Sequence, residues 1–359
     1  MGNIDKKSRA QYRTKVEEKF PDKIKFGKSK YIKKLSMRYG ENPGYPAAFY
    51  SEKDASGPNL ANIEVLKEGK KGLSYINIGD MDLGQRLVIK LNKIYEGKNI
   101  CALIKHEIPS GVAMGEDSLE TFNKAWGCDP LSNFGSVNVF NYEIDKSVAE
   151  LIVESKRNVE VVFAPSYHNE AMDILSARKP LRVVRMGADI HKESVDNGLE
   201  FKRVAGGILL QKRFDSKITS PDDVEVVSDK KPSPNEMNAL IFNWIVACYT
   251  RSNAIVIGKE DKVHGIGSGQ RSRIDATENA IKFSKRGYGT EDCVMASDAF
   301  MPFPDVVEMA SQNKIKAIIF PLGSIRDKEV IQRANELNIA MVVTRKPKET
   351  SCERSFLHR

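Results

Sequence analysis

The chain has 359 residues, of which 41% are hydrophobic and 29% charged, and its formal net charge is +8. Such a length exceeds one ordinary hydrophobic core and predicts two domains, while the composition is that of a globular protein rather than a disordered or fibrous one. No apolar run approaches the ~20 residues that cross a bilayer, so we expect no membrane partner.

Five cysteines, Cys101, Cys128, Cys248, Cys293 and Cys352, are scattered without a C-x-x-C pair. Their spacing predicts neither disulfides nor structural zinc, and favours a reducing, cytoplasmic setting. The first residues lack the apolar segment of a signal peptide, which agrees with that location.

The basic excess leaves an RNA-binding protein as one alternative. Residues 1–34 are polar and rich in lysine, and we expect residues 1–35 to form a basic arm or helix. Aromatic residues are not interleaved regularly with the basic ones, and no zinc-finger or RNP-like motif occurs. Nucleic acid is therefore an unlikely partner, and small anionic ligands fit the charge equally well.

A first α/β domain is predicted over residues 36–214. It opens with a turn-rich loop in which Arg38 and Tyr39 suit phosphate recognition, or simply form part of a surface loop. Residues 73–78 are apolar and polar in turn and lead into a helical pattern at 82–95. Helices follow at 116–126, 145–156 and 168–178, and strands at 100–104, 137–140, 159–164 and 181–185.

The strand at 100–104 is followed by Lys105-His106 and breaks at Pro109-Ser110-Gly111. Open α/β sheets bind ligands at the rim where strands end. A histidine there can accept and return a proton, and the adjacent lysine can stabilise developing negative charge. The alternative is a strand that ends at the surface with two solvated side chains.

Residues 206–211 form a predicted strand after paired glycines, where a ligand or another backbone segment comes close. The charged, proline-containing residues 215–234 are the predicted connection to a second domain at 235–359. That domain should contain helices at 235–250, 305–313 and 326–338. Its strands should lie at 254–258, 263–266, 293–297, 317–320 and 340–344.

Two loops of the second domain are candidate ligand sites. The G-x-G-x-G stretch at 265–269, before Arg271 and Arg273, is not the dinucleotide fingerprint, and forms either an anion cradle or a tight turn. Residues 297–305 hold two phenylalanines and two acids, which either grip a flat heterocycle or belong to the core.

Taken together, these stretches resemble the transformylase domain of the bifunctional purine enzyme AICAR transformylase/IMP cyclohydrolase. The matches cover roughly residues 36–359 in the family's order. They are Arg38–Pro43, Leu73-Ser74-Tyr75 with Asn77, Lys105-His106 with Pro109 and Gly111, Ser132–Gly135, Ala164-Pro165, Tyr249–Asn253, Gly265–Ile274, Ser297–Phe300 with Pro302-Phe303, Gly323-Ser324 with Asp327-Lys328, and the Arg-x-Phe-x-His ending.

The resemblance implies formyl transfer from 10-formyltetrahydrofolate to the 5-amino group of AICAR, giving FAICAR, by a phosphoribosylaminoimidazolecarboxamide formyltransferase. It implies two cytidine-deaminase-like three-layer α/β domains with mixed sheets, and a homodimer with sites at the interface. It also implies roles for individual residues. The catalytic ones are Lys105, His106 and His358; those around AICAR and its phosphate are Arg38, Tyr39, Gly135, Glu160, Arg273 and Arg354; those around the folate are Asn253, Phe300 and Asp305.

The residue types suit this chemistry. AICAR presents a weakly nucleophilic amine, so a base must remove its proton, which we assign to His106. Lys105 is assigned to the oxyanion or to protonation of the folate nitrogen. The reaction needs no catalytic metal, and the zinc signature of deaminases, H-x-E with P-C-x-x-C, is absent from the sequence.

The sequence departs from the family at a few positions. Gly44-Tyr45 replaces the usual His-Gln, Ser110 replaces a small residue or cysteine, and Glu160 replaces an aspartate. Only about 36 residues precede Arg38, so we expect a stand-alone transformylase without a cyclohydrolase domain. A diverged regulator that binds purine nucleotides without turnover stays an alternative, favoured by Gly44-Tyr45.

Overall fold

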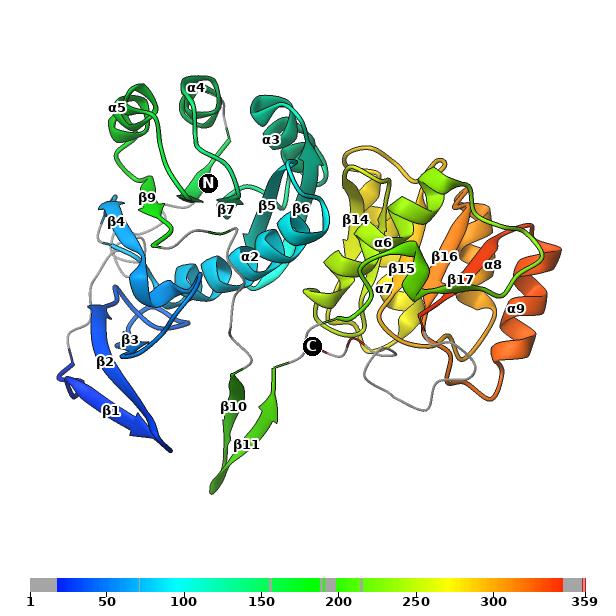
Figure 1. Cartoon of the computed structure of the whole chain (residues 1–359), viewed down its shortest axis with the longest axis horizontal. Coiled ribbons are helices and arrows are strands. Elements are labelled where there is room, and N and C mark those ends of the chain that lie inside the picture. Colours follow the sequence, from blue (N-terminus) through cyan, green and yellow to red (C-terminus); the bar gives the residue numbers. More distant parts are fainter. Residues whose placement is uncertain are drawn as a thin grey trace, which may run out of the picture. The chain divides into compact units, whose positions relative to one another are not determined.

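The computed structural model describes residues 18–70, 72–154, 157–187, 190, 198–213, 216–344, 357 and 359 (Figure 1). These residues belong to two compact units. One unit contains the described residues within 1–89, 104–107 and 134–195, and the other contains those within 90–103, 108–133 and 196–359.

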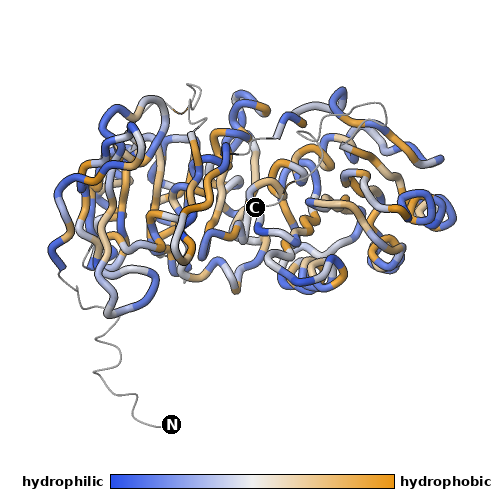
Figure 2. The backbone as a smooth tube through the Cα atoms, turned by 90° about the horizontal axis from the view of Figure 1, so that it is seen from below, coloured by the Kyte–Doolittle hydropathy of each residue, from blue (hydrophilic) through white to orange (hydrophobic). Residues whose placement is uncertain are grey.

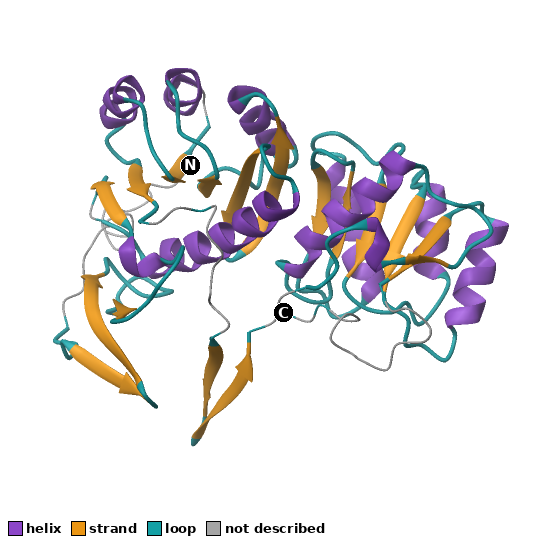
Figure 3. Cartoon of the chain, in the orientation of Figure 1, coloured by secondary structure: helices purple, strands orange, loops and turns teal. Residues whose placement is uncertain are grey.

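Helices and strands alternate along most of the described chain (Figure 3). The α-helices are α2 Tyr75–Ile94, α3 Ser118–Gly127, α4 Lys146–Glu154, α5 Asn169–Ala177, α6 Pro234–Cys248, α7 Arg273–Ser284, α8 Asp305–Gln312 and α9 Asp327–Glu336. The strands up to residue 212 are β1 Lys23–Phe26, β2 Ser29–Ser36, β3 Ala48–Glu52, β4 Glu64–Lys67, β5 Asn99–Lys105, β6 Ile108–Gly115, β7 Ser136–Phe140, β8 Val159–Ala164, β9 Arg182–Arg185, β10 Leu199–Val204 and β11 Gly207–Lys212. The remaining strands are β12 Glu225–Val226, β13 Ile255–Gly258, β14 Val263–Gly267, β15 Val294–Ser297, β16 Ala317–Phe320 and β17 Ala340–Val343.

Two six-stranded sheets share one topology. The first has the strand order β4-β9-β8-β7-β5-β6, and the second has the order β12-β17-β16-β15-β13-β14. The elements also follow each other alike along the chain: a strand, a helix, two strands, and then three helix–strand units. In each sheet the last three strands are parallel to one another, and an antiparallel edge strand pairs with the last of them. The expectation of α/β architecture with mixed sheets is therefore confirmed.

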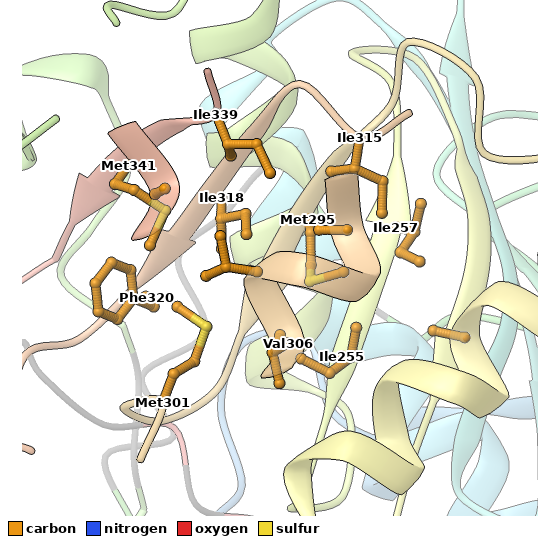
Figure 4. Close-up of a cluster of buried hydrophobic side chains, with 14 of the residues drawn as sticks. Ile255, Ile257, Met295, Met301, Val306, Ile315, Ile318, Phe320, Ile339 and Met341 are labelled. Carbon is orange, nitrogen blue, oxygen red and sulfur yellow. The ribbon is translucent and has the colours of Figure 1, made fainter. Parts of the chain in front are cut away.

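The second sheet is covered on both faces, which makes a three-layer arrangement. One face packs on α7, α8 and α9 through a cluster that includes Ile255, Met295, Ile318, Phe320 and Met341 (Figure 4). The other face packs on α6, whose side chains from Ala239 to Ala247 are all buried. A helix that is apolar on nearly every side is typical of a buried position.

Strands β7, β8 and β9 of the first sheet are mostly buried, as expected for parallel strands with helices on both faces. Figures 1 and 3 show α2 on one side of these strands and α4 and α5 on the other. Along the helices, the side that points outward is mainly hydrophilic, and the side toward the strands is mainly hydrophobic (Figure 2).

Helix α2 begins earlier than the sequence pattern predicted. Residues 73–78 look like alternating polar and apolar positions, but Tyr75 already opens the helix. The Asn77 N–H donates to Ser74 Oγ at 3.2 Å, and the Ser74 N–H donates to Asn77 Oδ1 at 3.0 Å. This reciprocal pair satisfies donors at the helix start and fixes the start there.

Two glycines of the G-x-G-x-G stretch, Gly265 and Gly267, serve packing. A Cβ atom at Gly265 would lie 2.1 Å from the carbonyl oxygen of Ala280, and one at Gly267 would lie 1.8 Å from that of Ala276. Both carbonyls belong to α7, so the glycines allow β14 to approach this helix closely. The Ser272 hydroxyl caps the start of α7 by accepting the Asp275 N–H.

Three expectations for the connecting regions are corrected. Residues 23–26 and 29–36 are strands of a three-stranded sheet with β3, not a helix, while residues 1–17 lie outside the described residues. The paired glycines Gly206 and Gly207 form the turn of the hairpin β10–β11, and no backbone segment in the described ranges approaches them closely. Within the predicted connection, Glu225–Val226 forms β12 and pairs with β17.

No helix in the described part of the chain is long and apolar enough to cross a membrane.

Candidate functional site

The predicted catalytic pair lies at a strained turn. Strand β5 ends at Lys105 and β6 begins at Ile108, so His106 and Glu107 alone connect them. Both have positive φ angles, 54° and 57°. Two central residues with positive φ define a type I′ hairpin turn, in which asparagine and glycine are the usual residues. Holding two other residues there costs on the order of 1–3 kcal/mol each.

Lys105 is half-buried and reaches the loop before β7. Its Nζ donates a hydrogen bond to the carbonyl oxygen of Phe134 at 2.6 Å. Gly135 follows with φ 83°, and its N–H donates to the carbonyl oxygen of Asn158 at 2.5 Å. The structure therefore brings Lys105 next to the predicted backbone contact Gly135, and the His106 side chain is exposed.

Arg38 and Tyr39 are buried in a cationic cluster. Arg38 Nη2 donates to the Tyr39 hydroxyl at 2.9 Å and lies 3.7 Å from Glu160 Oε1, which also pairs with Arg182 at 3.1 Å. Burial and the nearby Arg38 charge lower the pKa of Arg182, although Glu160 opposes this effect. The buried Arg38 Nε has no hydrogen-bond partner within the described residues. Two guanidinium groups share one carboxylate here, and the Arg38 Nε–H remains as a further donor, which suits an anionic ligand.

The cationic cluster adjoins the start of α2. The Arg38 N–H donates to the Leu73 carbonyl, and the Tyr75 N–H donates to the Tyr39 carbonyl. A helix N-terminus carries a partial positive charge, which adds to that of the two arginines. Phosphate recognition by this loop, predicted from its residue types, has geometric support.

Asp80 connects this cluster with the His106 turn. It is buried on α2, and its Oδ1 accepts the Glu107 N–H at 2.6 Å. Burial raises the pKa of Asp80 to about 7, and the charges of Glu107 and Glu160 contribute to the rise, whereas hydrogen bonds from the backbones of Glu107 and His106 oppose it. Glu160 is therefore near enough to Asp80 to act on it electrostatically.

A second group of predicted residues surrounds Arg273. Its guanidinium donates to the Asp298 carboxylate and, at 2.8 Å, to Asn253 Oδ1. Asp298 is fully buried and also accepts the Ala254 N–H at 3.0 Å. Its backbone carbonyl accepts the Leu357 N–H at 3.0 Å, so the described part of the tail lies at this group.

The two acids of the loop at 297–305 have different environments. Asp298 is paired inside the protein, whereas Asp305 is exposed as the first residue of α8 and accepts the N–H of Val306 at 2.8 Å. Phe300 is half-buried, and Phe303 is exposed with the Arg326 guanidinium 4.8 Å from its ring centre. Only Asp305 of the two acids is placed to meet a ligand.

Two predicted residues, Arg354 and His358, lie outside the described residues. Among the residues that are described, no three His, Cys, Asp or Glu side chains are grouped so that they could hold a metal ion.

The family model described as "AICARFT/IMPCHase bienzyme" matches residues 5–283. The chain belongs to this family. It is 43% identical over 315 residues to the bifunctional purine biosynthesis protein PurH of Acidithiobacillus ferrooxidans, an alignment that covers 88% of this chain and 58% of that relative. The chain thus spans little more than half the length of the curated relative that it matches.

For a member of this bienzyme family, the structure adds two residues that sequence reasoning did not place at the site, Asp80 and Arg182. Each had a signal. Asp80 shares an apolar helical stripe with Leu87 and Leu91, and Arg182 is the first residue of β9, directly before two buried valines. A charged residue at a position expected in the core needs a partner, and such pairs occur often at functional sites.

Proposed function

We propose that this chain transfers the formyl group of 10-formyltetrahydrofolate to the 5-amino group of AICAR, giving FAICAR in purine biosynthesis in the cytoplasm. Family membership supports the proposal. The observation that carries it is the joint position of two groups in one compact unit: the Lys105-His106 turn, and the Arg38 cluster with its unpartnered buried donor. Proton transfer and anion binding are the two tasks that the reaction requires.

In this mechanism, His106 removes the proton of the amine as it attacks the formyl carbon, and Lys105 stabilises the oxyanion or protonates the departing folate nitrogen. Lys105 is suited to this role because its Nζ is held by a hydrogen bond to the Phe134 carbonyl, directly before Gly135. Aligned binding of two substrates removes a further part of the barrier. The reaction proceeds without a catalytic metal.

The binding roles in this proposal are those that the family resemblance implies. Arg38 and Tyr39 bind the AICAR phosphate together with Arg354, while Glu160 and the backbone of Gly135 face the rest of the nucleotide. Arg273 assists AICAR binding. Asn253, Phe300 and Asp305 form the folate side, and His358 completes the catalytic region.

We further propose that the enzyme is a homodimer of cytidine-deaminase-like domains, with the hairpin β10–β11 at the subunit interface. The hairpin forms a two-stranded sheet of its own, and such a sheet is marginally stable without a partner surface. Phe201 pairs with Leu210 and Arg203 with Ile208, so these apolar side chains share one face, which is exposed. A second copy of the chain would cover it.

The interface is tested by analytical ultracentrifugation of Phe201→Glu beside Lys202→Glu, which places the same charge on the opposite face of the hairpin. Phe201→Glu should shift the protein toward monomer, and Lys202→Glu should leave it dimeric. Equal behaviour of the two variants would argue against this interface.

The activity is tested by adding AICAR and 10-formyltetrahydrofolate to the purified protein and following tetrahydrofolate release. Wild type should turn over, and Lys105→Ala and His106→Ala should lose most of the rate. His168→Ala is a matched control, because His168 is exposed and pairs with Glu143 at 2.9 Å. Tight AICAR binding without turnover would instead support the nucleotide-binding regulator, for which the exposed Tyr45 of the Gly44-Tyr45 departure is the feature to examine.

A further inference from the structure

The turn between β5 and β6 has a conformation that its residues do not favour. Lys314 and Asn338 also have positive φ angles, but each follows directly after the last turn of a helix, where this conformation is common. His106 and Glu107 instead adopt it consecutively in a hairpin turn that lacks glycine. Such an outlier persists only where surrounding groups hold it, and it points to a functional constraint.

Helix α2 contacts the turn at two neighbouring residues. The Asp80 carboxylate accepts a hydrogen bond from the Glu107 N–H at 2.6 Å. Next to it, the Glu107 side chain lies over Gly79, since a Cβ atom there would lie 2.7 Å from Glu107 Oε1.

We propose that Asp80 is a positioning residue for His106: its carboxylate holds the His106–Glu107 turn in the left-handed conformation from which the imidazole meets the substrate. The inference rests on the proposed function for its catalytic part. Asp80 acts through the backbone, because its described hydrogen bond to the turn comes from the Glu107 N–H and not from the imidazole. It therefore exchanges no proton with the substrate.

The absence of glycine at position 107 supplies a rescue test. Glycine adopts positive φ without strain, so Glu107→Gly should let the turn keep its conformation when the carboxylate is gone. The test compares wild type, Asp80→Asn, Asp80→Ala, and Asp80→Ala combined with Glu107→Gly. Asp82→Asn is the matched control, because Asp82 lies on the same helix and pairs with Arg86 instead of the turn.

Two readouts keep the proposal separate from the proposed function. Histidine labelled with nitrogen-15 gives one backbone amide signal for each of the five histidines, and His106→Gln assigns the His106 signal. This signal reports the backbone conformation of the turn, next to the Glu107 N–H that bonds Asp80, whether or not the protein turns over. Formyl transfer is measured separately, as kcat and as KM for AICAR.

In Asp80→Ala, the His106 amide signal should move upfield, and kcat should fall about 10–100-fold while KM for AICAR stays within about twofold. Asp80→Asn, which keeps the shape of the side chain, should show a smaller loss in the same direction. Adding Glu107→Gly should restore much of kcat, and Asp82→Asn should match wild type.

An unchanged His106 amide signal in Asp80→Ala and Asp80→Asn would overturn the proposal, as would a full loss of kcat without rescue by Glu107→Gly. A rise of KM at constant kcat would also contradict it, because it would assign Asp80 to substrate binding. If wild type transfers no formyl group, the proposed function fails, and the amide signal still decides whether Asp80 holds the turn.

Discussion

Ionised Asp80 is costly to the folded protein, so replacing it with asparagine should stabilise the chain at alkaline pH. The pKa of Asp80 rises from 3.8 to about 7, chiefly because the carboxyl is buried. Glu107 and Glu160 face the same carboxyl and raise its pKa further, while the hydrogen bonds from the backbones of Glu107 and His106 act in the opposite direction. The net shift means that folding favours the neutral acid.

The magnitude follows from proton linkage. Between pH 3.8 and about 7, the folded protein keeps the Asp80 proton and the unfolded chain releases it. The stability contributed by the neutral carboxyl is complete below pH 3.8 and is lost as the pH rises to about 7. At about 1.4 kcal/mol for each pKa unit, the loss amounts to about 4 kcal/mol, and asparagine does not titrate.

Urea unfolding of wild type, Asp80→Asn and Asp82→Asn at about pH 5 and about pH 8 tests this. The free energy of unfolding of Asp80→Asn relative to wild type should increase by about 3 kcal/mol from the lower to the higher pH, because about two units of the shift fall in that range. Taking the difference removes groups that titrate alike in both proteins. A difference that is independent of pH, or that matches the Asp82→Asn control, would refute the argument.

Three further predictions concern buried charged and titratable groups. Burial lowers the pKa of His264 to about 4, so wild type should lose stability as the pH falls from 6.5 toward 4, and thermal unfolding of His264→Gln should show less of this loss. Asp298→Ala leaves the Arg273 guanidinium buried without its carboxylate, and denaturant unfolding should show a loss of about 3–5 kcal/mol. Arg182→Gln removes a charge from the cationic cluster around Arg38, so the proposed function predicts that KM for AICAR should rise while kcat changes little; a fall in kcat alone would place Arg182 elsewhere in the mechanism.

Most strands of both sheets were predictable because they are short apolar runs bounded by turn residues, but β4, β6 and β12 were not predicted, and the expected break at Pro109-Ser110-Gly111 lies inside β6. The run at 159–164 became β8 with the same bounds, and the predicted strands at 254–258 and 263–266 correspond to the antiparallel pair β13 and β14. Prediction failed where local chemistry competed with the periodic pattern. Lysine alternates with apolar residues over 23–36, so the charge hid a strand pattern, and the reciprocal bonds of Ser74 and Asn77 start α2 within an alternating stretch.

The candidate site was predictable as a set of residues but not as an arrangement. Lys105 and His106 stood out because they follow a buried strand. The left-handed turn that presents His106, and the Asp80 carboxylate beneath it, depend on contacts between residues 27 positions apart. For the same reason, the sequence did not show that the glycines at 265 and 267 allow the close approach of α7 to the strand.

The most direct test of the account follows the formyl carbon itself. Carbon-13-labelled 10-formyltetrahydrofolate is mixed with AICAR and the purified protein, and NMR reports whether the label leaves the folate nitrogen for the 5-amino group of AICAR. Transfer by wild type, and its loss in both Lys105→Ala and His106→Ala, is the predicted result. A label that stays on the folate while AICAR binds, or transfer that survives in His106→Ala, would contradict the central claim.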